Sequence, residues 1–176
     1  VALDALTSHF PIKKIIVIYM FFQKERNDNY STPVSYLKVI EPFIPKQYII
    51  NDPFFFDGLV KENWKEVNRE IIHENKDFFT TTHKGDIFVS NPPFSNLKDI
   101  FIKLFEVGKP FILLLPIQKI AQLKIQRVIK DKHLQMIVSP IYQGFINSRG
   151  EQTRCSSQYF SYVCWKMDLE RDLIFI

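Results

Sequence analysis

The sequence predicts an α/β fold, in which helices cover a mostly parallel sheet that has one reversed strand near its end. Residues 110–116 are continuously apolar, as expected of a central parallel strand that is buried on both faces. Upstream of this run, short strand-like segments alternate with helical patterns. Downstream, residues 136–142 and 159–167 look like two strands whose connection leaves no room for a helix, so we expect them to be antiparallel.

The size and composition of the chain fit one compact domain. Its 176 residues are 46% apolar, which is enough for a single hydrophobic core. Residues 30–176 form the expected domain, and residues 1–29 are an N-terminal extension of unclear role. This extension contains an apolar run from Ile15 to Phe22, which is too short to span a bilayer and lacks a cleavage site. We therefore expect a core strand or helix there, and no membrane partner.

Two helices and two short strands are predicted before residue 80. Apolar residues recur at helical spacing at Val34, Leu37 and Ile40, and Pro42 and Pro45 end this helix. The expected elements are a helix over 34–43, a buried strand over 48–50, a helix over 59–67 and a strand over 70–74.

The middle of the chain continues this alternation. A clearer strand over 86–90 stops at an Asn-Pro-Pro sequence. The helix after it, over 97–107, places Ile100 and Leu104 on one face. A further helix over 117–130 follows the apolar run, and together these elements predict a parallel sheet.

Charge and cysteine usage bear on the partners and the compartment. The formal net charge of +4 suits a polyanion such as nucleic acid, although Lys and Arg form no continuous basic run. Cys155 and Cys164 match neither a zinc-site spacing nor a disulfide framework, which predicts a reducing, intracellular compartment. The four histidines are isolated in the sequence, so we expect no metal and no nucleophilic triad.

The sequence Asn91-Pro92-Pro93-Phe94 is the most informative motif, because it directly follows a predicted strand, where open α/β sheets place their ligand crevice. The two prolines stiffen the loop. The Asn91 side chain and the Pro92 backbone offer carbonyl acceptors, which can hold both N–H hydrogens of an amine and favour a pyramidal nitrogen. The Phe94 ring offers a face on which a base can stack. A strand-ending turn is the alternative interpretation.

The segment from Asp86 to Phe94 resembles the fourth motif of the amino-methyltransferase family, an Asp/Asn/Ser-Pro-Pro-aromatic sequence after a strand that begins with an acidic residue. This resemblance implies a Rossmann-like class I methyltransferase sheet with S-adenosylmethionine as cofactor. It also implies methyl transfer to an exocyclic amine, for which adenine N6 in DNA or RNA is the leading substrate. The catalytic residues that it implies are Asn91, Pro92, Pro93 and Phe94.

Two upstream segments are similar to the cofactor-binding segments of the same family. The sequence from Asp52 to Gly58 resembles the cofactor loop, Asp-Pro-Phe-x-Gly-x-Gly, but Phe56 stands where the family generally has a small residue. The sequence Tyr30-Ser31-Thr32-Pro33 resembles the Tyr-x-Thr-Pro segment, which contacts the methionine moiety. The cofactor contacts implied by these two segments are Tyr30, Thr32, Pro33, Asp52, Pro53, Phe54, Asp57 and Gly58.

The resemblance implies three further cofactor contacts. Glu74 fits the acidic residue that ends the family's second strand and binds the ribose, and Asp77-Phe78 fits the Asp-aromatic pair beside the adenine. These residues lie unusually close together in the sequence, so the sheet is expected to lack an edge strand. The division of roles between Glu74 and Asp77 stays open, and an exposed surface pair is the alternative.

A polar loop near the C-terminal end offers substrate contacts. Residues 147–154 contain two arginines that can reach a phosphate backbone, although exposed hairpin loops often carry such residues without function. The predicted substrate-binding residues are Phe94, Ser95, Arg149 and Arg154.

Two other functions remain alternatives. One is a catalytically inactive, methyltransferase-like subunit that acts as a binding or scaffold protein, which Phe56 favours. The other is a protein glutamine-N5 methyltransferase, because related motifs methylate a glutamine amide. The chain has no room for a sizeable target-recognition domain, so any choice of target sequence is expected to come from short loops, flanking segments or a partner subunit.

Overall fold

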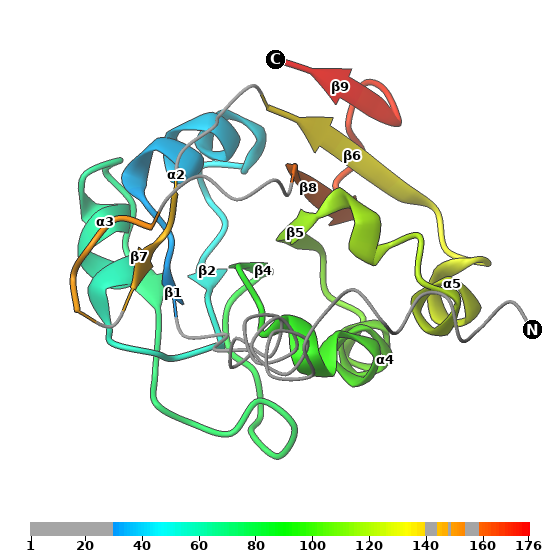
Figure 1. The fold of residues 1–176 in the computed structure, drawn as a ribbon, viewed down its shortest axis with the longest axis horizontal. Coiled ribbons are helices and arrows are strands. Elements are labelled where there is room, and N and C mark those ends of the chain that lie inside the picture. The colour runs from blue at the N-terminus through cyan, green and yellow to red at the C-terminus, as the bar shows by residue number, and fades with distance from the viewer. Residues whose placement is uncertain (1–29, 140–143, 148, 154–158) are drawn as a thin grey trace, which may run out of the picture.

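The computed structural model describes residues 30–139, 144–147, 149–153 and 159–176. These residues form a seven-stranded mixed sheet and a separate two-stranded ribbon, with helices on both faces of the larger sheet (Figure 1). The apolar run at 15–22, the rest of the extension over 1–29, and Arg154 lie outside the described residues.

The predicted elements are present, with some changes at their ends. The helix over 97–107 and the apolar central strand agree with the structure. The helix expected over 117–130 is divided, because Gln122 takes an extended conformation with ψ 130° before the second part starts. The elements are β1 (Tyr30–Ser31), α2 (Val34–Ile40), η1 (Glu41–Phe43), β2 (Ile50–Asn51), α3 (Leu59–Lys65), β3 (Ile71–Ile72), β4 (Ile87–Ser90), η2 (Phe94–Asn96), α4 (Leu97–Val107), β5 (Phe111–Pro116), η3 (Ile117–Lys119), α5 (Leu123–Ile129), β6 (Leu134–Val138), β7 (Ile146–Asn147), β8 (Phe160–Trp165) and β9 (Leu173–Phe175).

The strands of the main sheet follow the order β3-β2-β4-β5-β8-β6-β9. Neighbouring strands are parallel except at β8, which is antiparallel to both β5 and β6. The single reversed strand predicted near the end of the sheet is thus confirmed. The edge strand β9 and the ribbon of β1 with β7 were not predicted.

The alternation of side chains along the central strands explains why the sheet lies between two layers of helices. In β5, Ile112 and Leu114 belong to the apolar cluster under α2 and α3, whereas Leu113 and Leu115 belong to the cluster under α4 and α5. Successive strand residues point to opposite faces, so a strand that is apolar throughout has to be covered on both sides. Figure 1 shows the two helix pairs on opposite sides of the sheet. In the described part of the chain, no helix is both long and apolar enough to cross a membrane.

Buried polar contacts fix the start of β2 and therefore the position of the loop that follows it. The guanidinium of Arg69, which is 7% exposed, donates to the carbonyl oxygens of Tyr48 at 2.9 Å and Pro45 at 3.2 Å. The Asp86 carboxylate, at the start of β4, accepts the Ile49 amide at 2.8 Å. These bonds pair backbone groups before the strand begins, so β2 is held in register between β3 and β4.

Candidate functional site at the carboxyl edge of the sheet

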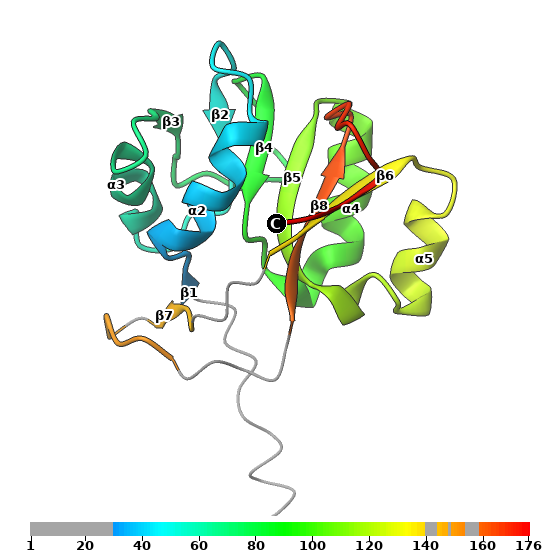
Figure 2. The ribbon, with the colours of Figure 1, turned by 90° about the horizontal axis from the view of Figure 1, so that it is seen from above.

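Three neighbouring parallel strands, β3, β2 and β4, end at one edge of the sheet. The chain runs from β2 to β3 on one side and then to β4 on the other side of β2, which makes this edge a topological switch point, where open α/β sheets bind their ligands. Asp52 follows β2, Glu74 follows β3 and Asn91 follows β4. Figure 2 shows the β1–β7 ribbon beyond the ends of β2 and β4.

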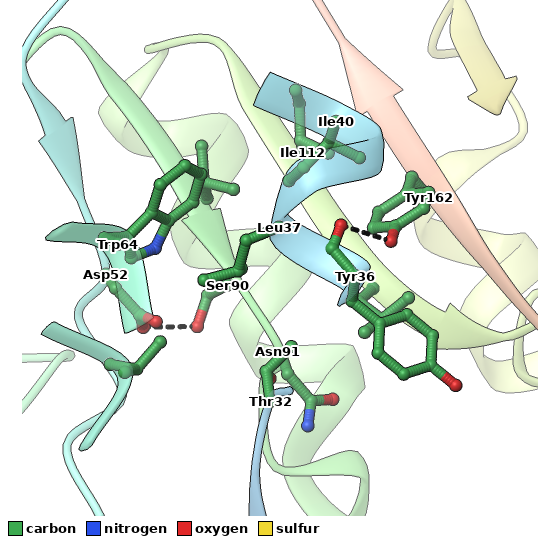
Figure 3. A pocket seen from close by; sticks show the side chains of 13 residues that line it. Thr32, Tyr36, Leu37, Ile40, Asp52, Trp64, Ser90, Asn91, Ile112 and Tyr162 are labelled. Carbon is green, nitrogen blue, oxygen red and sulfur yellow. Dashed lines mark hydrogen bonds between the residues drawn. The ribbon is translucent and has the colours of Figure 1, made fainter. Parts of the chain in front are cut away.

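A pocket between α2, α3 and the sheet brings together residues from three of the predicted segments. Thr32, Asp52 and Asn91 all line it (Figure 3). The cavity has a volume of about 20 Å³, which is room for roughly one water molecule. The residues that line it and were not predicted as site residues are Tyr36, Leu37, Ile40, Val60, Trp64, Val89, Ser90, Ile112, Leu114 and Tyr162.

Asp52 is a buried carboxylate, with 5% of its surface exposed. Its Oδ1 accepts hydrogen bonds from the Ser90 hydroxyl and, at 3.3 Å, from the Phe54 amide. Burial raises the pKa of Asp52 to about 6, and the neighbouring His73 together with these two hydrogen bonds opposes part of that rise. The carboxylate is therefore poised to ionise near neutral pH, inside a pocket where a cationic ligand group would find little competing water.

Two polar side-chain atoms of this pocket are buried without a hydrogen-bond partner among the described residues. They are the amide oxygen of Asn91, which is an acceptor, and the indole Nε1 of Trp64, which is a donor. An unpaired buried polar group costs about 1–3 kcal/mol, so folded proteins rarely retain one without a role. In Figure 3, the Asn91 amide lies beside Thr32, away from the hydrogen bond that joins Ser90 to Asp52.

The Asn91-Pro92-Pro93-Phe94 loop leads directly from β4 into η2. Pro92 is buried, and Pro93 has φ −63° and ψ 120° immediately before the helical turn. The half-buried Phe94 ring lies 6.2 Å from the ring of Phe160, tilted by 45°. The Lys119 ammonium lies 5.6 Å from the centre of the Phe94 ring. The loop therefore presents an acceptor and an aromatic ring at the same edge.

The Tyr30–Pro33 segment is fastened to the predicted cofactor loop. The Ser31 hydroxyl lies 2.7 Å from each carboxylate oxygen of Asp57. The Asn63 side chain of α3 donates to the Thr32 carbonyl oxygen at 2.8 Å. Tyr30 pairs with β7, and Pro33 stands directly before α2. The segments 30–33 and 52–58, both of which the family resemblance assigns to S-adenosylmethionine binding, are thus in direct contact.

Gly58 is required by the backbone conformation at the start of α3. Its φ is +81°, in the left-handed region that side chains disfavour. An added Cβ would meet only the Phe55 ring, at an ordinary 3.6 Å, so a close approach of the surrounding chain does not explain the glycine. The preceding Asp57 is exposed and accepts the amide of Leu59, the first residue of the helix, at 3.0 Å.

A second hollow, also of about 20 Å³, brings together four more of the predicted cofactor residues. Pro53, Glu74, Asp77 and Phe78 line it. Phe78 is buried, and its ring lies 4.7 Å from that of Phe54. The structure thus brings Phe78 and two acidic residues to one hollow beside the end of β3, and Phe54 packs against Phe78.

Glu74 and Asp77 differ in their surroundings. The exposed Glu74 forms an ion pair with Lys76 at 2.7 Å, which holds the pKa of the carboxyl group below its usual value. The Asp77 carboxylate accepts the amides of Phe79 at 2.8 Å and Thr80 at 3.0 Å, so it caps its own turn. Glu74 is therefore the more available of the two for a ligand. β3 is the edge of the sheet on this side, and no described strand lies beyond it.

The predicted substrate residues lie at the periphery of the same edge. Ser95 is exposed in η2. Arg149 is exposed in the turn after β7, where its amide donates to the Asn147 side chain at 2.9 Å. Arg154 lies outside the described residues. Neither of the first two lines the pocket of Asp52 and Asn91.

No protein-family model and no curated protein sequence matches the chain. Within the described ranges, no group of three or more His, Cys, Asp or Glu side chains is arranged to hold a metal ion. The pocket geometry and the motifs that line it are therefore the features that bear on function.

Sequence reasoning missed several pocket residues. Ser90 directly precedes the Asn-Pro-Pro-Phe motif, so its position at a strand end was a usable signal. Trp64 and Tyr162 carry no such signal. The Tyr162 hydroxyl donates to the Tyr36 carbonyl at 2.7 Å across 126 residues of sequence, and only the folded chain reveals that contact.

Proposed function

We propose that the chain is an S-adenosylmethionine-dependent methyltransferase that acts on an exocyclic amine, with adenine N6 in DNA or RNA as the substrate. The mixed sheet with one reversed strand is compatible with the Rossmann-like class I methyltransferase fold that the motif resemblance implies. The net charge of +4 supports a polyanionic substrate.

The observation that carries this proposal is the buried amide oxygen of Asn91, which has no partner within the described chain and lies in one pocket with the ionisable Asp52. An unpaired acceptor fits an N–H donor of the substrate. With the Pro92 carbonyl as second acceptor, both hydrogens of an amine can be held, which directs the nitrogen lone pair away from the ring. Alignment of this kind accounts for much of the acceleration in a direct transfer.

The residues around the two hollows fit the cofactor by their chemistry. Asp52 offers a carboxylate for the ammonium group of the methionine moiety, and the Phe54–Phe78 ring pair offers an apolar surface for adenine. Glu74 offers an exposed carboxylate for the ribose hydroxyls. When bound, S-adenosylmethionine supplies a methyl group on a sulfonium. Asn91 and Pro92 would hold the amine so that its nitrogen faces that methyl carbon, and the proton lost from the methylated nitrogen would pass to solvent.

The volume of the hollows sets a condition on binding. Each is about 20 Å³, far smaller than a nucleoside cofactor. The two hollows meet at the end of β2, where Asp52 lines the first and both Asn51 and Pro53 line the second. In the loop that continues to Gly58, Phe55 and Asp57 are exposed. We expect this loop to move outward on binding, with the two hollows joining into one cleft. Phe56, where the family has a small residue, would have to move with it.

A methyl-transfer assay tests whether adenine in nucleic acid is the substrate. The protein is incubated with tritium-labelled S-adenosylmethionine and single-stranded DNA or RNA that contains adenine. As controls, the same oligonucleotides carry unsubstituted purine, which lacks the amine, at every adenine position. We expect label only in the adenine strands and N6-methyladenine after digestion, identified by mass spectrometry. Label in a glutamine-containing peptide but not in nucleic acid would contradict the adenine assignment.

A further inference from the structure

We infer that Lys119 is a substrate-responsive phosphate-binding residue, which covers the Phe94 ring in the free protein and moves to the nucleic-acid backbone when a base stacks on that ring. This inference rests on the proposed function. It adds a specificity-determining residue that none of the sequence motifs includes.

The position of Lys119 comes from the strand order. The η3 turn follows β5, and β5 is the parallel neighbour of β4, so η3 and the Asn91–Phe94 loop leave the sheet at the same edge. The Ile117 amide donates to the Tyr159 carbonyl at 2.8 Å, which ties η3 to the residue before β8. The turn is thereby held beside the loop, and its last residue is Lys119.

The geometry at the ring shows what Lys119 does in the free protein. Its ammonium lies over the Phe94 ring, 5.6 Å from the ring centre. Among the described residues, the ring of Phe160 lies beside that of Phe94, tilted by 45° and not stacked parallel to it. A planar base that stacks on the covered face needs the space that the lysine occupies, so base stacking and this cation–π contact exclude each other.

Charge explains why a nucleic acid favours the exchange. A base that stacks on the ring displaces the ammonium from its ring contact, and every nucleotide brings a phosphate that attracts the lysine charge. The transferred methyl group comes from a sulfonium, so an ammonium left over the ring would also repel the positive charge of the reacting centre. A glutamine-containing peptide supplies a flat amide but no obligatory anion, so it would have to displace Lys119 without that compensation.

The test compares binding of a fluorescent, adenine-containing single-stranded DNA and the same RNA sequence, each over a series of salt concentrations in the presence of S-adenosylhomocysteine. The variants are Lys119→Gln and Lys119→Arg, and Lys124→Gln on the neighbouring α5 removes an equal charge as the matched control. The salt slope is the slope of log affinity against log salt concentration, and one lost phosphate contact lowers its magnitude by about 0.7 on a single strand. If the variant and the wild type bind equally at 1 M salt, this difference is a roughly eight-fold loss of affinity at about 50 mM salt.

We expect that loss of affinity and slope for Lys119→Gln, near-normal binding for Lys119→Arg, and no change for Lys124→Gln. An unchanged slope in Lys119→Gln would overturn the inference, as would equal losses in the two Gln variants, which would indicate general charge attraction. Wild-type protein that binds S-adenosylhomocysteine but binds neither the DNA nor the RNA would also overturn the inference about Lys119. That result would still support the cofactor site. Failure to bind S-adenosylhomocysteine is the distinct result that counts against the proposed function itself.

Discussion

Replacing Asp52 by Asn is expected to increase the free energy of unfolding at neutral pH and, at the same time, to weaken S-adenosylhomocysteine binding by about 100-fold or more. The stability effect follows from burial, which raises the pKa of this carboxyl group from 3.8 to about 6. The folded protein holds the proton more tightly than the unfolded chain does. The free energy of unfolding therefore falls as the pH rises from about 4 to about 6.

The size of this gain follows from the same shift. Two pKa units correspond to about 3 kcal/mol, so the ionised Asp52 destabilises the fold at neutral pH by up to that amount. Asn has no charge to desolvate, and its Oδ1 can still accept from Ser90 and Phe54. We expect the free energy of unfolding of Asp52→Asn at pH 7 to exceed that of the wild type by about 1–3 kcal/mol, as measured by urea unfolding. The decrease in this free energy between about pH 4 and 6, expected for the wild type, should be absent from the variant.

The binding effect has the opposite sign, because the ammonium of the ligand needs an ionised partner. Affinity of the wild type should fall as the pH drops below about 6, and affinity of Asp52→Asn should be weak at every pH. Asp172→Asn is the matched control. Its exposed carboxyl has its pKa lowered by hydrogen bonds from His133 and Gln135, so its loss should reduce stability at neutral pH and leave ligand binding unchanged. An Asp52→Asn variant that binds normally would contradict the assignment of Asp52.

Replacing Asn91 by Ala is expected to slow methyl transfer by at least about 100-fold while leaving S-adenosylhomocysteine affinity within a factor of about two. The reason is that the Asn91 oxygen is assigned to the amine rather than to the cofactor. The substitution also removes a buried acceptor that has no partner in the described chain, so stability should be unchanged or higher. Single-turnover transfer, calorimetric titration and thermal unfolding measure the three quantities.

Two further variants separate the acceptor from the loop conformation. Asn91→Asp keeps an acceptor oxygen at the same place and should retain part of the activity, since an acidic residue also occurs at this position of the family motif. Asn96→Ala removes an exposed amide at the end of η2 and should transfer at the wild-type rate. Equal activity of Asn91→Ala and the wild type would remove the main support for amine binding by the Asn-Pro-Pro-Phe loop.

The sequence predicted the part of the fold that depends on long apolar patterns. The continuous run at 110–116 became β5, and the apolar face over 97–107 became α4, because both signals are repeated over many residues. The short elements gave no comparable signal. Neither the three-residue strand β9 nor the β1–β7 ribbon has an alternation long enough to read. Ile49 was expected in a buried strand, but it is 53% exposed, because the strand begins only at the next residue.

The candidate site was predictable where a motif coincides with a strand end. Asp52 and Asn91 follow adjacent parallel strands, so their meeting in one pocket follows from the topology. Trp64 and Tyr162 enter the same pocket from α3 and β8, through contacts that only the tertiary packing creates. Asp77 shows the reverse case: the motif marks it for a ligand, but its carboxylate is engaged by the amides of its own turn.

Calorimetric titration of the protein with S-adenosylhomocysteine at pH 7.5 shows whether the chain binds the methyltransferase cofactor, because this product occupies the cofactor pocket without requiring the right substrate or turnover. We predict one site per chain with micromolar affinity, weakened at least about 100-fold in Asp52→Asn and retained in Asn91→Ala. No heat of binding at millimolar ligand would contradict the account. It would instead favour a methyltransferase-like scaffold protein, in which Phe56 and the small volume of the hollows exclude the cofactor.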